Sequence, residues 1–187
     1  MKFLAVITTA ALILTSAINV FAQDSDHGAH SVSINIPQVA LLDLEGGSSI
    51  TLAPTAPTEA GDALSFASAT DNSIWVNYSS IVASGKTRTV NAAITSGTVP
   101  TGLLLKVTAG SYAGSGKGTL GTAGSQVTLS TTAQNIITGI GSCYTGNGAS
   151  NGHNLTYTLE LGSTDNYNQL VQANTSITVT YTITEYN

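Results

Sequence analysis

Few side chains in this sequence have a type and spacing suited to chemistry, and each such group lacks a required partner. Residues 148–152 read Gly-Ala-Ser-Asn-Gly, the G-x-S-x-G spacing of a hydrolase nucleophile, and His153 follows. That nucleophile needs a buried strand before the serine and a helix after it, whereas here a glycine-rich stretch precedes and an alternating apolar segment follows. The only cysteine, Cys143, has no neighbour that would activate a thiol. We therefore predict no catalytic residues and a protein that is not an enzyme.

Sites for phosphate or for metal ions are not indicated either. The stretch GSGKGT at 114–119 resembles a phosphate-binding loop, but that motif needs glycine where Ser111 stands and serine or threonine where Gly118 stands. Two histidines and two aspartates lie between residues 24 and 30, in a polar arm that offers a metal no fixed geometry. We expect no cofactor and no metal.

The charge balance excludes several partners. Of the 187 residues only 8% are charged, and ten acidic residues outnumber five basic ones, for a net charge of −5. This composition argues against nucleic acid and anionic membranes as partners. Because there is one cysteine, no disulfide can form within the chain, and packing must supply the stability.

The N-terminus has the three parts of a secretory signal peptide at residues 1–22. Lys2 supplies the positive charge, an apolar run covers residues 3–14, and Val-Phe-Ala at 20–22 provides a cleavage site. The apolar run is shorter than the roughly 20 residues that span a bilayer, so we expect no transmembrane segment in the mature chain. The signal predicts a secreted or cell-surface protein, exported to the bacterial periplasm or beyond.

The remainder predicts one β domain. Residues 23–30 read as a disordered polar arm, and residues 31–187 form the expected domain. Short segments rich in Val, Ile, Thr and Tyr recur between turn residues, and after the signal no segment keeps a helical apolar period. Besides residues 31–36 and the apolar run that follows Pro37, we expect strands near 48–52, 73–78, 88–94, 103–108, 126–130, 135–139, 154–161 and 175–184. The predicted fold is an all-β, immunoglobulin-like antiparallel sandwich.

Exposed aromatic side chains would suit a ligand-binding module. Trp75 and Tyr78 lie on opposite faces of the same expected strand, and either could stack on a sugar ring, as could Tyr112 and Tyr144. Two glycine-rich stretches, 109–125 and 145–154, would frame such a site; the first is expected to be a long flexible loop or an irregular hairpin. Carbohydrate or another ligand is thus one candidate partner, and the alternative is that Trp75 simply packs in the core or at its rim.

The two ends of the expected domain carry the clearest patterns. Residues 31–36, SVSINI, alternate apolar and polar side chains, and residues 175–184, TSITVTYTIT, do so over a longer run; the penultimate residue is Tyr186. With the export signal, this arrangement resembles the subunits of bacterial chaperone-usher pili and the related spore-coat-U-like proteins. Two features depart from that family: Cys143 stands alone where the family usually has a pair, and Asn174 occupies a position that is often glycine.

The resemblance implies assembly by strand addition, in which the N-terminal extension of one subunit completes the sandwich of the next. Val32, Ile34 and Ile36 would be the anchors of the donated strand. The acceptor groove or core would contain Ile177, Val179, Tyr181 and Ile183. Alternatively, residues 31–36 are the first strand of a complete sandwich. The sequence thus predicts a structural or adhesive protein, with self-assembly or other surface subunits as partners, and a carbohydrate-binding module as the alternative.

Overall fold

The computed structural model describes residues 26–186, so the predicted signal peptide at 1–22 and the start of the polar arm lie outside the described residues. The chain divides into two units, with the boundary between Asn35 and Ile36. In the first unit, residues 26–35 form no helix or strand. The compact unit therefore begins at Ile36, five residues later than the predicted domain.

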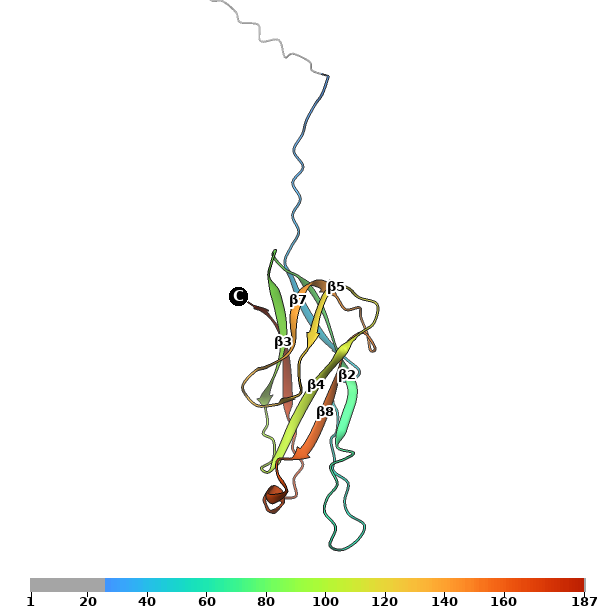
Figure 1. The fold of residues 1–187 in the computed structure, drawn as a ribbon, viewed down its shortest axis with the longest axis vertical. Helices are drawn as coiled ribbons and strands as arrows, with labels where there is room; N and C mark the ends of the chain where they lie inside the picture. The colour runs from blue at the N-terminus through green and yellow to red at the C-terminus, as the bar shows by residue number, and fades with distance from the viewer. Residues whose placement is uncertain (1–25, 187) are drawn as a thin grey trace, which may run out of the picture. The chain divides into compact units, whose positions relative to one another are not determined.

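The compact unit is all-β, and its strands are antiparallel throughout (Figure 1). A single short 3₁₀-helix, Thr164–Gln169, is the only helix in the described part of the chain. The strands are β1 (Val39–Glu45), β2 (Thr70–Ile81), β3 (Thr87–Ser96), β4 (Leu103–Ala113), β5 (Lys117–Ala123), β6 (Val127–Thr128), β7 (Gln134–Tyr144), β8 (Gly152–Leu161) and β9 (Thr178–Tyr186).

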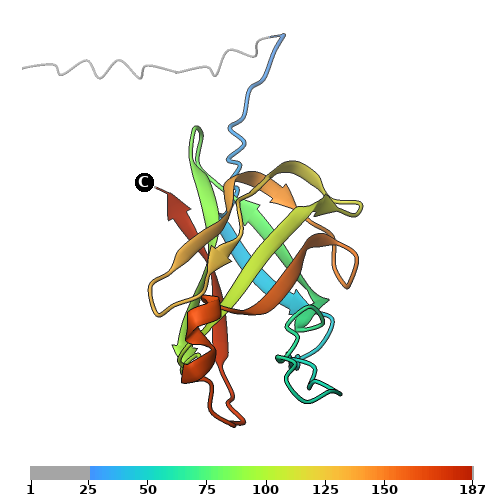
Figure 2. The ribbon, with the colours of Figure 1, turned by 60° about the horizontal axis from the view of Figure 1, so that its bottom comes forward.

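The nine strands form one sheet in the order β6-β4-β8-β2-β7-β3-β9, with β1 added to β2 and β5 added to β7. Strand β2 is the junction, because it pairs with β8 over residues 70–76 but with β7 only at Ser79 and Ser80. The sheet curves around the core so that β1 approaches β9, as the ribbon shows (Figure 2). These two strands are close without being hydrogen-bonded partners.

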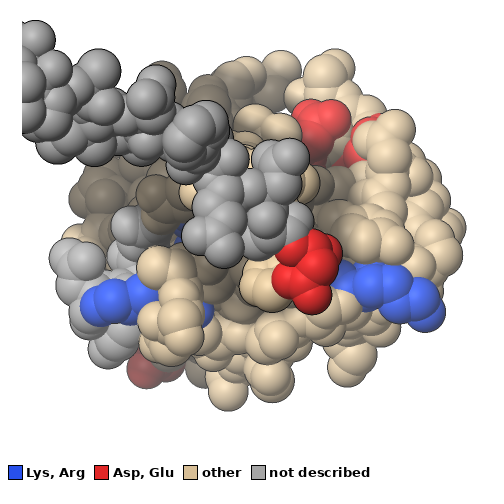
Figure 3. All heavy atoms as spheres, turned by 90° about the horizontal axis from the view of Figure 1, so that it is seen from above, with Lys and Arg blue, Asp and Glu red and all other residues tan. Residues whose placement is uncertain are grey.

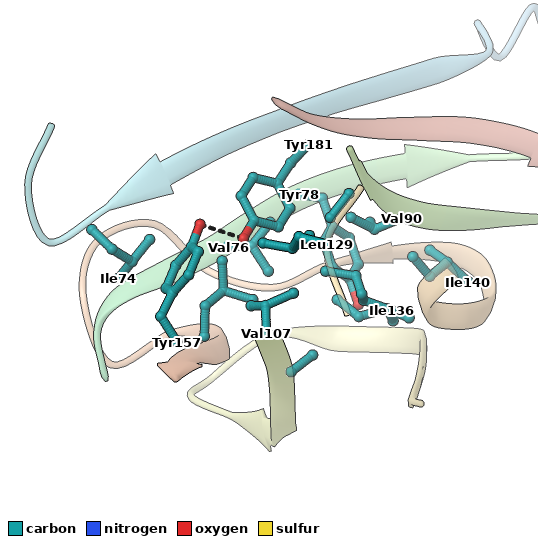
Figure 4. Close-up of a cluster of buried hydrophobic side chains, with 14 of the residues drawn as sticks. Ile74, Val76, Tyr78, Val90, Val107, Leu129, Ile136, Ile140, Tyr157 and Tyr181 are labelled. Carbon is teal, nitrogen blue, oxygen red and sulfur yellow. Dashed lines mark hydrogen bonds between the residues drawn. The ribbon is translucent and has the colours of Figure 1, made fainter. Parts of the chain in front are cut away.

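The core fills the space enclosed by this curved sheet (Figure 4). It is built from side chains on one face of each strand, as the alternating pattern requires. Val76, Val107 and Leu155 have no exposed surface, and neither do Ile137 and Ile140 of β7. No disulfide is present in the described residues and Cys143 is buried and free, so stability rests on this packing.

The structure differs from the sequence expectations in four places. Residues 48–52 alternate but form no strand, because no neighbouring strand offers them hydrogen bonds. The stretch 109–125 is neither a long loop nor a paired hairpin: it is the end of β4, a short turn and β5, and these two strands pair with β8 and β7 respectively. The 3₁₀-helix was not foreseen. Residues 31–36 form no strand within the chain.

Charged side chains are sparse on the surface. In the view from above they form small separate groups, and most of the visible described surface is uncharged (Figure 3). Lys106 and Glu160 form a cross-strand ion pair between β4 and β8. Within residues 26–186 no helix is long and apolar enough to cross a membrane.

Candidate functional site: an open seam and its groove

The seam between β1 and β9 is the most unusual feature of the sheet. Among the described strands, β1 pairs only with β2, and β9 pairs only with β3. Each therefore keeps one edge whose backbone N–H and C=O groups have no strand partner. Because the chain runs in opposite directions along β1 and β9, one further strand between them would be parallel to one edge and antiparallel to the other. An open edge of this kind is a template for strand addition.

A groove with a volume of about 950 Å³ opens beside this seam. Its walls come from β1, β2, β4, β8 and β9 and from the segments 47–54 and 170–176. The lining includes the buried core residues Leu105 and Tyr157 and the half-buried Leu159, Ile177 and Val179, together with the more exposed Leu44 and several serine, threonine and amide side chains. The groove thus exposes part of the hydrophobic core of the sheet to solvent.

Of the four residues predicted as acceptor groove or core, two line the groove and two pack in the core or against it. Ile177, which directly precedes β9, and Val179 line the groove and are half-buried. Tyr181 lies deeper, with 8% of its surface exposed, and its hydroxyl is 2.5 Å from that of Tyr157 on β8 (Figure 4). Ile183 is half-buried against the core. Burial raises the pKa of the Tyr181 hydroxyl far above its ordinary value, so this pair stays neutral.

The three predicted donor anchors are exposed. Val32, Ile34 and Ile36 have 71, 82 and 73% of their surfaces accessible to solvent. They lie in a segment without hydrogen-bonded secondary structure that ends at Pro37. Three large apolar side chains in alternation, all facing water, are unusual for a chain that has no partner for them. The alternative expectation, a first strand within the chain's own sheet, is not what the structure contains.

The residues considered for chemistry have structural roles. Both ring nitrogens of His153 are engaged, Nδ1 at 2.8 Å from the Gly110 carbonyl oxygen and Nε2 at 2.9 Å from the Tyr78 hydroxyl. Ser150 sits in the turn before β8 with a φ of 67°. Burial raises the pKa of the Cys143 thiol to about 11, which keeps it protonated. Within residues 26–186 no three His, Cys, Asp or Glu side chains gather in a way that could hold a metal ion.

The two predicted stacking residues differ in their exposure. Tyr78 is a core residue with 3% of its surface exposed and stacks on His153, so a ligand cannot stack on it. Trp75, on the opposite face of β2, is half-buried. The sequence did not show which face of β2 is buried, because apolar residues occur on both faces.

A second, shallower depression of about 340 Å³ lies on the outer side of β1 and β2, next to the segment that follows β7. Two exposed apolar side chains stand there, Leu41 at 66% and Tyr144 at 52% exposure. Asp43, Asn77 and Asn147 also line it. Tyr144 is one of the aromatic residues that the sequence offered for ligand stacking, and its side chain is exposed.

Sequence reasoning missed most of the groove wall. The alternation in residues 154–161 showed that Tyr157 and Leu159 share a face, but only the fold shows that they line one groove with Leu44 and Leu105. Comparison of the chain with protein-family models, curated proteins and solved structures found no match. The function proposed below therefore rests on the geometry and on the sequence.

Proposed function

We propose that this protein is an exported, non-enzymatic structural subunit that assembles by strand addition into the groove between β1 and β9. The observation that carries the proposal is the pairing of two incomplete features in one chain. The groove exposes apolar core surface beside two unpaired strand edges, and residues 32–36 expose three apolar side chains in strand alternation. The groove offers free strand edges and apolar surface but has no strand to cover them, and residues 32–36 have the side-chain pattern of a strand but no sheet to join.

The donor segment and the free edge of β1 have similar lengths. Residues 31–36 in extended form would span about 20 Å, and the seven residues of β1 span about 23 Å. A strand of this length would place Val32, Ile34 and Ile36 on one face, toward the groove. Moving a large aliphatic side chain from water into apolar surroundings contributes about 1.5–3 kcal/mol, and the strand edges add main-chain hydrogen bonds.

The strand pairings support an immunoglobulin-like sandwich that lacks one strand. One run of pairings is β1-β2-β8-β4-β6 and the other is β9-β3-β7-β5, and the two are joined by the short contact between β2 and β7. In a sandwich of this kind, β1 and β9 are the edges of opposite sheets, and a strand laid between them would close the seam. The sequence of the first 22 residues supports export, which would bring such subunits together outside the cytoplasm.

The proposal is tested on protein that begins at Gln23, beside a form that lacks residues 23–36. Size-exclusion chromatography with light scattering and electron microscopy should show polymers of the longer form only. The shorter form should remain folded, because no residue before Ile36 belongs to a strand. A longer form that stays monomeric at high concentration, with a shorter form that unfolds, would contradict strand addition between copies.

The depression beside Tyr144 favours a second candidate function, the binding of a carbohydrate or a similar polar ligand. An exposed aromatic ring beside carboxylate and amide groups is a common arrangement at sugar sites. This candidate predicts saturable binding to a glycan panel, lost in the variant Tyr144→Ala and retained in Tyr167→Ala, which removes another exposed tyrosine. Equal binding by both variants would exclude this site.

A further inference from the structure

The hydroxyl pair of Tyr157 and Tyr181 has one more hydrogen than the pair itself can use. Tyr157 lines the groove and is 7% exposed, and its hydroxyl lies 2.5 Å from that of Tyr181, which is 8% exposed (Figure 4). Each hydroxyl carries one hydrogen, and only one of the two can lie between the oxygens. The second hydrogen has no acceptor among residues 26–186. The groove therefore contains one hydrogen-bond donor that is free for an occupant.

This donor makes the groove selective for an occupant that carries an acceptor oxygen. In the free protein the acceptor of the second hydrogen is water, because the protein supplies none. An oxygen atom on the occupant can replace that water and keep the hydrogen bond. A plain hydrocarbon would displace the water and leave a buried hydroxyl hydrogen without an acceptor, which costs affinity.

The charge of the groove restricts the occupant further. Among the described residues that line it, none is Asp, Glu, Lys, Arg or His. Serine, threonine and amide side chains of the segments 48–51 and 172–176 are the polar groups of the lining besides Tyr157. An ionised group brought into this space would lose hydration without meeting an opposite charge. The matching occupant is therefore neutral.

The size of the groove suits a small molecule. Its volume of about 950 Å³ lies at the upper end of the range for small-molecule sites, which is roughly 300–1,000 Å³. Such sites have mostly apolar walls and a few polar groups that fix the orientation of the ligand. Here Leu105, Leu159 and Val179 belong to the apolar part of the wall, and the Tyr157 hydroxyl is the buried polar group.

We infer that the groove binds a neutral, mainly hydrocarbon molecule with one acceptor oxygen, and that the Tyr157 hydroxyl donates its hydrogen to that oxygen. Long-chain esters, ketones and alcohols belong to this class. Fatty acids do not, because their carboxyl group is ionised at neutral pH. Carbohydrates do not either, because most of their surface requires polar contacts that Leu105, Leu159 and Val179 cannot provide.

Binding of such a molecule requires only the groove, but its consequence for assembly rests on the proposed function. The ligand would cover Ile177 and Val179, which line the same groove that a donated strand would enter. The two occupants therefore compete. A subunit that holds the ligand keeps its groove closed to strand addition, so the ligand regulates assembly.

The test compares three probes of equal chain length, which are methyl decanoate, decane and decanoate. The protein begins at Gln23 and carries Ile34→Asp, so that its own segment does not compete for the groove. Displacement of the neutral dye Nile red at neutral pH measures the affinities. Methyl decanoate should bind with saturation and more tightly than either decane or decanoate. Equal affinity for the three probes, or no saturable binding of the ester, would overturn the inference.

Two tyrosine variants of that protein test the hydrogen bond. Tyr157→Phe should weaken the binding of methyl decanoate by about two- to tenfold, which corresponds to one net hydrogen bond, and should leave the affinity for decane unchanged. Tyr181→Phe is the matched control: it keeps the Tyr157 hydroxyl and should bind the ester at least as tightly as before. Equal weakening by the two variants, or no weakening by Tyr157→Phe, would contradict recognition by Tyr157.

Two aspartate variants test the location. Ile177→Asp places a charge in the groove and should abolish binding of the ester, whereas Thr182→Asp places it at an exposed position of β9 and should not. Equal binding by both variants would place the ligand elsewhere and overturn the inference.

The effect on assembly is measured separately, with the chain that keeps Ile34. Saturating methyl decanoate should slow the formation of polymers, as followed by light scattering. Equal polymer formation with and without bound ester would overturn the competition. If this chain forms no polymers but the ester binds through Tyr157, the ligand site stands and the proposed function fails.

Discussion

The hydroxyl of Tyr78 lies 2.9 Å from Nε2 of His153, and both side chains are buried between β2, β5 and β8. The Tyr78 hydroxyl also contacts the Leu120 carbonyl oxygen, which can only accept. Nδ1 of His153 must carry a hydrogen, because it faces the Gly110 carbonyl oxygen. In the neutral ring, Nε2 and Leu120 therefore compete for the single hydrogen of the hydroxyl.

This arrangement predicts a loss of stability in mild acid. Burial lowers the pKa of His153 below its ordinary value of 6.5, although hydrogen bonds to the Gly110 and Leu120 carbonyls partly oppose this. The unfolded chain then binds a proton more readily than the folded chain. Full stability is present above pH 6.5 and is lost as the pH falls from there toward the folded pKa. Urea denaturation between pH 8 and 5 should show this decline.

The variant His153→Gln is the control for that decline. It should be less stable at pH 8 but should show a flatter dependence on pH, in a chain that also carries His27→Gln and His30→Gln to remove the exposed histidines. A decline of equal size with and without His153 would assign the effect to other groups.

The buried tyrosine pair predicts a non-additive result. Tyr181→Phe removes one partner and leaves the Tyr157 hydroxyl buried without its hydrogen bond, which should cost about 1–3 kcal/mol. Replacing both tyrosines by phenylalanine removes both polar groups and should cost less than the two single changes together. A double-mutant cycle measured by denaturation gives the coupling energy. Strict additivity would show that the two hydroxyls do not interact.

Alanine substitutions at two glycines distinguish the cost of backbone strain from the cost of steric overlap. Gly148 and Gly152 have φ values of +92° and +81°, so alanine is strained at either position by about 1–2 kcal/mol. At Gly152 an added Cβ would lie 2.1 Å from the Val76 carbonyl oxygen in β2, whereas at Gly148 it would meet nothing within 4 Å. Gly152→Ala should therefore lower the free energy of unfolding by at least about 2 kcal/mol more than Gly148→Ala. Equal losses would contradict the close approach of β8 to β2.

The sequence patterns predicted strands well where one face of the segment was apolar. They predicted strands poorly where strand formation depends on pairing with a neighbouring segment. Residues 154–161 and 175–184 alternate strictly, and β8 and most of β9 form there. Strand β5, with the sequence KGTLGTA, has weak intrinsic strand preference and exists because its glycines allow close packing on β7. An added Cβ at Gly118 would lie 2.2 Å from the Ser142 carbonyl oxygen, a constraint that no local pattern reveals.

The candidate site was predictable in part. The alternation at Val32, Ile34 and Ile36 marked a strand that needs a partner, but not that the chain leaves it exposed. Residues 48–52 alternate in the same way and line the groove without pairing. Both segments look like strands in sequence because their side chains suit a sheet. Hydrogen bonding to a neighbour makes a strand, and that neighbour is a property of the fold or of the assembly.

The central claim is that the exposed segment of one copy enters the groove of another. Two single variants, each blocking one half of that contact, isolate it. Ile34→Asp should prevent donation while leaving the groove intact, and Ile177→Asp should prevent acceptance while leaving the donor intact. Circular dichroism should confirm that both remain folded, and each alone should fail to form polymers.

Mixing the two variants in equal amounts is the most direct measurement. The Ile177→Asp chain can still donate, and the Ile34→Asp chain can still accept, so light scattering after separation should show a species of twice the monomer mass that contains one copy of each. The complex should not grow further, because its remaining donor and groove are both blocked. A mixture that contains only monomers, with both variants folded, would contradict strand addition.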